Sequence, residues 1–408
     1  MARSRFTRLD GAAAFGMFTY ASSVVATPII LLRLAQDLGF GLAEGGGIEA
    51  IRTLFLLAVL MASGGAAARI GKTATLAAGS FTLGAGLLAY AIAPSYAFVL
   101  IAVVLVGLGG GVLEALLNPL VQDEHPDDSG RYLNIVNAFF SVGVLTSVLL
   151  VGELLTRGVS WRLLIGGIGG AAVVLGFFFT LFGREKRRAR RRAKRAGTQL
   201  ANASSDVSAR PSGAARAIVK EPVFWLFAVA MFCGGGAEGA FTFWSASYIQ
   251  LNFDTLARAG AFGTAAFAGG MVVGRFASGR FVKQGRLHVL IIASAITGVV
   301  ASLAAWAAES QLAFFLVVFA AGLSIACFWP SIQSHAAAVL PVDSTTLFIL
   351  LSVAGIPGFG LTSWAMGLIA ERVSLRASLL VIPAELALLA VVMIVAHQKT
   401  EKDRRATA

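Results

Sequence analysis

The sequence predicts an all-α membrane protein in which twelve transmembrane helices form two pseudo-symmetric halves of six. Of its 408 residues, 57% are hydrophobic and 13% are charged, whereas soluble domains hold roughly 25% charged residues. Apolar stretches long enough to cross a hydrocarbon core of about 30 Å, which takes roughly 20 residues each, recur along the whole chain. The densest group of basic residues follows the sixth stretch and separates two sets of six.

Each apolar stretch is expected to be one membrane-spanning helix. Arg3, Arg5 and Arg8 precede the first stretch, which is longer than the apolar core of a signal peptide and has no small-residue cleavage site after it. We therefore expect the first helix to be retained. The expected spans cover residues 11–34, 46–68, 73–94, 97–121, 131–155, 161–182, 221–250, 256–278, 287–307, 311–338, 345–370 and 374–396.

The net charge of +12 is concentrated between the halves, in residues 184–195. Basic loops stay on the cytoplasmic side of a membrane, so this linker and both termini are expected in the cytoplasm, with the protein in an inner or plasma membrane. The acidic stretch at 123–128 falls on the same side, because acidic residues contribute little to this rule. The expected domains are an N-terminal bundle (1–182), a basic cytoplasmic linker (183–218) and a C-terminal bundle (219–408).

The basic linker has a second interpretation, as a site for anionic lipid or nucleic acid, because Lys/Arg clusters attract phosphate groups. The cytoplasmic position of the linker explains the basic cluster without either ligand. We therefore expect the lipid bilayer, and not nucleic acid, as a partner of the protein. The linker is rich in Ala, Gly and Ser through residue 215, which indicates a mobile segment.

An acidic residue, Glu114, lies midway along the fourth apolar stretch. A charge at bilayer depth costs at least about 2.5 kcal/mol, so such a residue normally faces a cavity, a partner or a proton path. A carboxyl group in such surroundings can bind and release a proton as its exposure alternates. The alternative is a glutamate that only locks this helix to a neighbour. Asn118 lies one turn further along the same helix face.

Two segments suggest a repeat. Residues 64–72 lie at the end of the second span and residues 274–280 at the end of the eighth, and both place glycine and arginine at corresponding helix ends. The pair resembles the gating-loop signature of the major facilitator superfamily, which implies two six-helix bundles with a substrate site between them near the midplane. Ala68 departs from the superfamily pattern, which usually has an acidic residue at this position. The charged contacts of the gate would then depend more on the second loop. The implied gating residues are Arg69, Gly71, Lys72, Arg275 and Arg280.

A narrower resemblance rests on two consecutive helices. Residues 113–119 read Leu-Glu-Ala-Leu-Leu-Asn-Pro and residues 131–139 read Arg-Tyr-Leu-Asn-Ile-Val-Asn-Ala-Phe. This order is similar to that of the fucose:proton symporter family and its glucose-galactose porter relatives, and the Gly-Ala-Glu at 236–238 agrees. The resemblance implies a secondary active transporter of a small polar solute, most simply a monosaccharide in symport with protons by alternating access. A monomer is the superfamily default.

The resemblance and the side-chain chemistry together give the candidate site. Glu114 and Glu238 are the proton-coupling candidates, and the glycines around Glu238 would let its helix bend or unwind. Asn137 matches a family position linked to sugar binding, and its amide suits sugar hydroxyls, whereas Asn134 has an equal packing interpretation. The candidate substrate-binding residues are Asn118, Asn137, Trp244, Tyr248, Trp329 and Gln333.

Tryptophans at such positions have two interpretations. Each can stack on a sugar ring or anchor its helix at the membrane interface. Trp329, beside Pro330, is the strongest cavity candidate of the three tryptophans considered, which also include Trp244 and Trp364. His335 is expected to cap the cytoplasmic end of its helix.

One departure keeps other functions open. Proton-coupled relatives carry an aspartate in the first span, and this chain has no acid there. Glu114 would then carry more of the coupling, or sodium would replace the proton, with carbonyl oxygens near residues 234–236 as ligands. The alternative within the superfamily is a drug or metabolite exporter that acts as a proton antiporter. A receptor that signals through the linker is a third interpretation.

Several classes of function lack their motifs. The sequence has no phosphate-binding Gly-x-x-x-x-Gly-Lys-Ser/Thr loop, nucleophile elbow or metal-ligand cluster, so we expect neither an enzyme nor a cofactor or metal. Cys233 and Cys327 both fall within spans and imply no disulfide framework. Glu49 and Arg52, three residues apart on one helix, are expected to form an ion pair near the start of the second span.

Overall fold

The computed structural model describes residues 6–125, 129–195, 218–281, 284–340 and 344–407, and every regular element in these ranges is helical. Within them, the side chains of residues 129–134, 185–195, 276, 279–281, 284, 344–346, 348 and 402–407 are not described.

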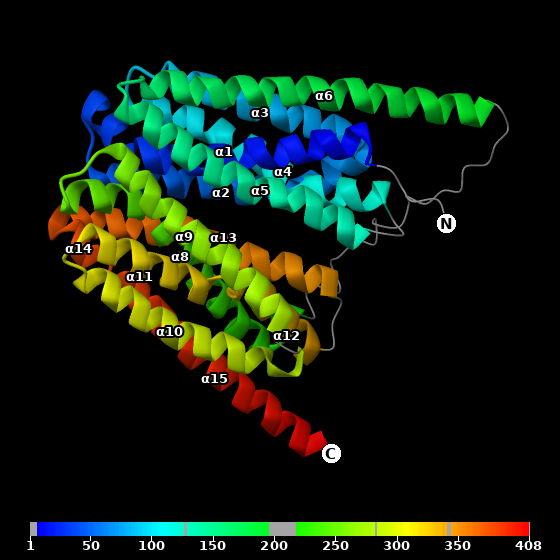
Figure 1. Ribbon diagram of the computed structural model, residues 1–408. Coiled ribbons are helices and arrows are strands. Elements are labelled where there is room, and N and C mark those ends of the chain that lie inside the picture. The colour runs from blue at the N-terminus through cyan, green and yellow to red at the C-terminus, as the bar shows by residue number, and fades with distance from the viewer. Residues whose placement is uncertain (1–5, 126–128, 196–217, 282–283, 341–343, 408) are drawn as a thin grey trace. The chain divides into compact units, whose positions relative to one another are not determined.

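Six long helices precede the basic linker (Figure 1). They are α1 (Arg8–Leu38), α2 (Leu42–Ile70), α3 (Lys72–Ala91), α4 (Tyr96–Glu124), α5 (Ser129–Thr156) and α6 (Trp161–Arg195).

The helices that follow the linker include one short 3-10 turn. They are α8 (Pro222–Asn252), α9 (Ala257–Phe281), η1 (Gln284–Arg286), α10 (Leu287–Ala307), α11 (Gln311–Ile325), α12 (Phe328–Val339), α13 (Ser344–Arg372), α14 (Leu375–Ser378) and α15 (Val381–Thr407).

The all-α membrane fold expected from the sequence is confirmed, with eleven described segments long and apolar enough to cross a membrane. Helices α11 and α12 together form one such segment, Gln311–Val339, and α14 and α15 form another within Leu375–Glu401. The expected eighth span is present as helix α9 but is not among the eleven. Glycine and alanine dominate α9, which also carries Arg258 and Arg275, so its hydropathy is low.

Local sequence explains several helix boundaries. Ser95 and Ser310 accept hydrogen bonds from the backbone N–H groups of Phe98 and Ala313, and so cap the starts of α4 and α11. Gly71 separates α2 from α3 at a backbone φ of 90°, a conformation that favours glycine.

Helix α6 extends beyond the expected end of its span at residue 182 and continues to Arg195 (Figure 1). The first part of the expected linker, residues 183–195, is therefore helical, and the mobility of the linker stays a prediction. Arg, Lys and Ala are good helix formers, so the basic sequence continues the helix that the apolar sequence begins. Residues 196–217 lie outside the described ranges.

The chain divides into two compact units. Unit 1 comprises residues 1–27, 54–147 and 159–209, and unit 2 comprises residues 28–53, 148–158 and 210–408. One end each of α1, α2 and α5 therefore belongs to unit 2, together with α8–α15. The domain boundaries expected from the sequence remain a prediction.

In unit 1, α3 packs against both α4 and α6 (Figure 1). Gly109 of α4 faces the backbone of Gly79 and Leu83, where a Cβ atom would collide with α3. Gly84 of α3 likewise faces the backbone of α6 at Gly169. Small residues allow such close approach in membrane bundles, where the hydrophobic effect supplies little force between helices.

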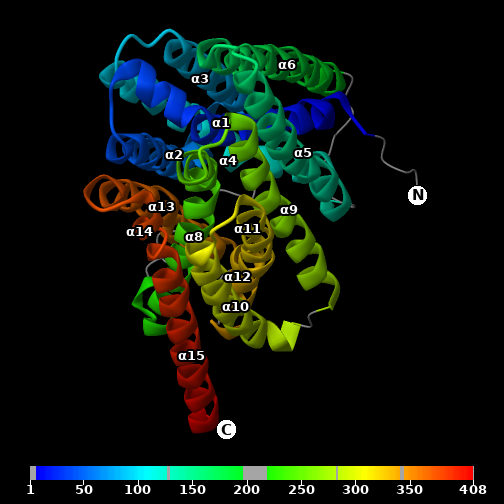
Figure 2. The ribbon, with the colours of Figure 1, turned by 60° about the vertical axis from the view of Figure 1, so that its left-hand side comes forward.

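In unit 2, α8 is the central helix and packs against α13, α15 and α9 (Figure 2). Its second half is almost entirely buried, including Phe241, Trp244 and Tyr248. Gly235 meets the backbone of Gly355, and Gly239 meets Phe359, so α8 and α13 lie close together. The glycines of α8 thus explain its central position.

Candidate functional site

A row of polar side chains crosses from α4 to α5 in unit 1. The side-chain amide of Asn137 donates a hydrogen bond to the Asn118 side-chain oxygen over 2.9 Å. Glu114 lies one turn before Asn118 on the same helix face. Glu114 and Asn137 are exposed and Asn118 is partly exposed, so this row is not part of the unit's packed core. The side chain of Asn134 lies outside the described residues.

A second polar group lies in unit 2, around Glu238 of α8. One Glu238 carboxylate oxygen is 3.4 Å from the Arg275 guanidinium of α9, and the Trp329 indole of α12 faces the same carboxyl as a hydrogen-bond donor. The other carboxylate oxygen is buried and has no hydrogen-bond partner among the described residues. The structure thus brings together Glu238, Arg275 and Trp329, which lie far apart in the sequence.

Two expectations concern this group. Arg275 is expected to belong to the cytoplasmic gate; its guanidinium contacts the Glu238 carboxylate, and its gating role stays a prediction. The glycines near Glu238 were expected to let the helix bend or unwind, yet α8 is one continuous helix from Pro222 to Asn252. Neighbouring helices occupy the space that side chains at these glycines would need, which explains the glycines by packing.

Gln333 follows Trp329 by one turn on α12. Its side-chain amide donates a hydrogen bond to the Ser352 hydroxyl of α13 over 2.9 Å. Trp329 and Gln333 are both partly exposed. With Glu238 and Arg275, they form the polar group of unit 2.

Trp244 and Tyr248 do not join this polar group. Both are fully buried in the core of unit 2, where the Trp244 indole donates to the Ser363 carbonyl over 3.0 Å and the Tyr248 ring stacks on Phe314. Neither ring has a free face for a solute in this structure. The expectation that they line the substrate site stays a prediction.

In the first gating segment, Lys72 links the start of α3 to the end of α4 through an ion pair and a hydrogen bond. The Lys72 ammonium is 2.8 Å from the Asp123 carboxylate and 3.2 Å from the Pro119 carbonyl oxygen. Arg69 is exposed at the end of α2. The side chain of Arg280, the last expected gating residue, lies outside the described residues.

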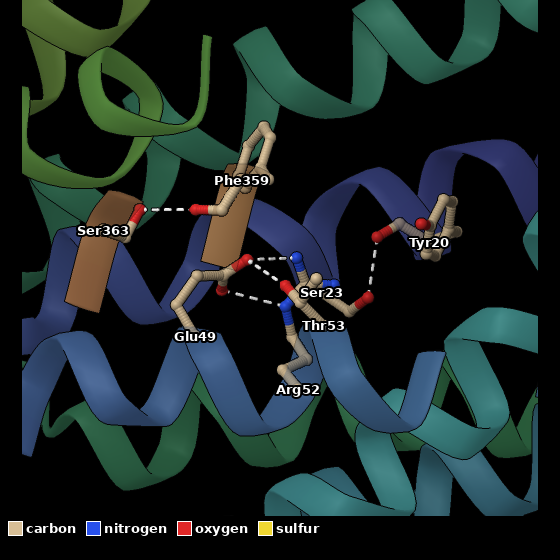
Figure 3. A network of polar contacts seen from close by, with 7 residues as sticks. All are labelled: Tyr20, Ser23, Glu49, Arg52, Thr53, Phe359 and Ser363. Atoms are coloured by element: carbon tan, nitrogen blue, oxygen red, sulfur yellow. Dashed lines mark hydrogen bonds and ion pairs between the residues drawn. The ribbon is translucent and has the colours of Figure 1, made fainter. Parts of the chain in front are cut away.

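The expected ion pair in α2 is present and buried. The Arg52 guanidinium makes hydrogen bonds of 2.5 and 2.9 Å to the two carboxylate oxygens of Glu49. Figure 3 shows the two side chains pointing toward one another, with the Thr53 hydroxyl 3.4 Å from the same carboxylate. The i, i+3 spacing was a sufficient signal for this pair.

Sequence reasoning missed a buried pair in unit 1. The imidazole of His125, at the end of α4, is 2.7 Å from the carboxylate of Asp10 in α1, and both side chains are almost fully buried. Thr7 and Asp10 also exchange hydrogen bonds as a capping box at the start of α1. The Thr-x-x-Asp pattern could have indicated the cap, but no local pattern indicates a partner 115 residues away.

A second missed residue is Glu385, which lies inside the last span, in α15. Its carboxylate accepts a hydrogen bond of 2.5 Å from the Thr362 hydroxyl of α13. The rule that selected Glu114, an acidic residue within an apolar stretch, would have found it.

Three histidines, one each from α10, α12 and α15, gather in unit 2. The rings of His288 and His397 stack with centroids 4.1 Å apart, and His335 lies 5.8 Å from His288. Among the described residues, no group of three His, Cys, Asp or Glu could hold a metal ion.

Long apolar helices that carry carboxyl, amide and guanidinium groups within their spans define a multi-pass membrane protein that handles a polar solute or ion. The sequence profile of the Major Facilitator Superfamily matches residues 12–284, and the chain belongs to this family. It is therefore a secondary transporter of a small molecule and not an enzyme.

Several solved structures share this fold. A bacterial homologue of the human lysosomal transporter Spinster, in an inward-facing unoccupied conformation, has 15% sequence identity and a TM-score of 0.77, covering 98% of this chain and 99% of that chain. The nucleoside transporter NupG has 10% identity and a TM-score of 0.77, covering 96% and 98%. A D-xylose-proton symporter has 12% identity and a TM-score of 0.70, covering 97% of each chain. These identities establish the fold alone, and a comparison with curated proteins gave no match.

Proposed function

We propose that this transporter carries a monosaccharide in symport with protons by alternating access, and that it works as a monomer with both termini in the cytoplasm. The observation that carries the proposal is the Asn118–Asn137 amide pair beside Glu114. Amides offer both donors and acceptors, which match the hydroxyl groups of a sugar. A carboxyl one helical turn away can exchange a proton while the amides hold the solute.

The polar group of unit 2 supplies the second set of proposed contacts. Trp329 offers an indole face for stacking, and Gln333 offers a side-chain amide. Glu238 is the second proton-coupling candidate, because one oxygen faces Arg275 and the other has no described partner. Protonation of Glu238 would weaken its attraction to Arg275, which links the charge of this site to the contact between α8 and α9.

The test is uptake of a labelled hexose panel into proteoliposomes under proton and sodium gradients imposed separately. Wild type is compared with Glu114→Gln and with Glu309→Gln, a control at an exposed position between α10 and α11. We expect proton-driven uptake that Glu114→Gln abolishes while sugar exchange persists, and that Glu309→Gln retains. Uptake driven by a sodium gradient alone would identify sodium, and not the proton, as the coupling ion.

A second candidate function is export of a drug or metabolite in exchange for protons. The observation that favours it is that α1 carries no acidic residue between Asp10 and Asp37, whereas a sugar:proton symporter of the resembling family carries one. Absence of uptake for every hexose, together with proton-driven efflux of lipophilic organic cations, would support export and contradict the sugar proposal.

A further inference from the structure

Glu385 lies where α8, α13 and α15 meet inside unit 2. One of its carboxylate oxygens, Oε1, accepts the 2.5 Å hydrogen bond from the Thr362 hydroxyl. The other oxygen, Oε2, is buried and has no hydrogen-bond partner among the described residues. The carboxyl therefore has one satisfied and one unsatisfied oxygen within a membrane-spanning bundle.

The sequence of α8 makes room for this carboxyl. A Cβ atom at Gly236 would lie 2.8 Å from Oε1 of Glu385 and 2.6 Å from the Thr362 hydroxyl oxygen. Any larger side chain at this position would displace both groups. The carboxyl and the hydroxyl thus pack directly against the backbone of α8, two residues from Glu238.

No described cation faces Glu385 from the helices around it. The titratable groups nearby on α8 are the Cys233 thiol, which faces the carboxyl, and Glu238. Helix α13 contributes Thr362, and α10, which packs on α15, carries no charged side chain between residues 289 and 307. An ionised carboxylate would have only the Thr362 hydroxyl to replace its hydration, which is costly in low-dielectric surroundings.

The geometry points to Glu385 as a further proton-binding site of this transporter, separate from Glu114. Glu385 takes one proton on Oε2 and becomes neutral, while the Thr362 hydroxyl continues to donate to Oε1. When the proton leaves to water, the carboxylate regains its negative charge and needs new donors. The described packing of α8, α13 and α15 does not provide these donors, so proton release requires the three helices to separate and admit water.

The role of this site in coupling rests on the proposed proton symport, but binding of the proton by Glu385 does not. Proton binding is measured by infrared difference spectroscopy of the full-length protein in lipid, as the pH is stepped without any substrate. A protonated carboxyl group gives a carbonyl-stretch band that its ionised form lacks. Among the carboxyl bands of wild type, we expect one that Glu385→Gln removes and that Glu114→Gln and Glu309→Gln retain.

Thr362→Val provides a second measurement for the case in which Glu385→Gln fails to fold. Valine has nearly the shape of threonine but donates no hydrogen bond, so the Glu385 band is expected at a higher frequency. An identical pH-difference spectrum in wild type and Glu385→Gln would overturn the inference, as would a band that Thr362→Val leaves unshifted. If the band behaves as expected while wild type shows no proton-driven uptake, the proposed symport fails and the proton site stands.

Discussion

Single polar residues in this transporter differ sharply in the number of partners that hold them. Asn118 and Asn137 share one hydrogen bond at a partly exposed position, whereas Glu49 and Arg52 share two in a buried one. A buried charge that loses its partner is strongly destabilising, but an exposed amide can exchange one partner for a solute or water. Substrate contacts and stability contacts are therefore expected at different residues.

The first prediction concerns the amide pair. Asn137→Ala removes the donor to Asn118 and one proposed solute contact, so we expect the KM for the transported sugar to rise about tenfold, equivalent to about 1.4 kcal/mol. Thermal unfolding in detergent should change little. Asn252→Ala, at the exposed end of α8, serves as the control, and an equal KM for all three proteins would contradict a substrate role.

The second prediction concerns the buried ion pair. Arg52→Met leaves the Glu49 carboxylate without its bidentate partner, so the free energy of unfolding should fall by about 3–5 kcal/mol. Combining Arg52→Met with Glu49→Gln should recover part of this loss. The measurement is thermal unfolding of the purified variants, with Arg157→Met as the control because that side chain is 71% exposed. A smaller loss for Arg52→Met than for Arg157→Met would show that the pair is not a stabilising contact.

At the scale of helices, packing depends on where small residues fall. Gly109→Ala places a methyl group against the backbone of α3 at Leu83, and we expect it to lower the free energy of unfolding by about 1–3 kcal/mol through overpacking. Gly64→Ala is the matched control in α2, because nothing lies within 4 Å of a Cβ atom at that position. Equal stability of the two variants in thermal unfolding would contradict close packing of α3 on α4.

The Lys72–Asp123 ion pair between α3 and α4 gives a prediction about transport rate. Lys72 contacts both the Asp123 carboxylate and the Pro119 carbonyl oxygen. If this ion pair stabilises the gate, Lys72→Gln and Asp123→Asn should each slow substrate exchange. The charge-swapped double variant, Lys72→Asp with Asp123→Lys, should recover part of the rate by restoring the attraction. A double variant no faster than the single variants would show that the ion pair does not set the rate.

At the scale of the whole molecule, the distribution of basic residues predicts the orientation of the protein. The native cysteines, Cys233 and Cys327, are both buried, so a single introduced cysteine can report its own accessibility. A membrane-impermeant maleimide should label Ser204→Cys, in the linker, only in inside-out vesicles. It should label Glu309→Cys, between α10 and α11, only in right-side-out vesicles. The opposite labelling pattern would show that the protein has the opposite orientation in the membrane.

The sequence by itself determined the number and approximate bounds of the long helices, because each crossing of a hydrocarbon core requires a long apolar stretch. It also determined that Glu114 is an unusual residue and that Glu49 and Arg52 pair, because spacing within one helix fixes which side chains are neighbours. These inferences need no knowledge of how helices pack. The same rule, applied to the last span, would have selected Glu385.

Only the tertiary structure decided which distant residues meet. It joined Glu238 to Arg275, Asp10 to His125 and Glu385 to Thr362, and it placed Trp244 in the core. The physical reason is that both lipid and a helix bundle's interior are apolar, so a spanning helix lacks the polar face that reveals its orientation in a soluble protein. Which side of such a helix meets a neighbour is set by close packing at small residues such as Gly109 and Gly236.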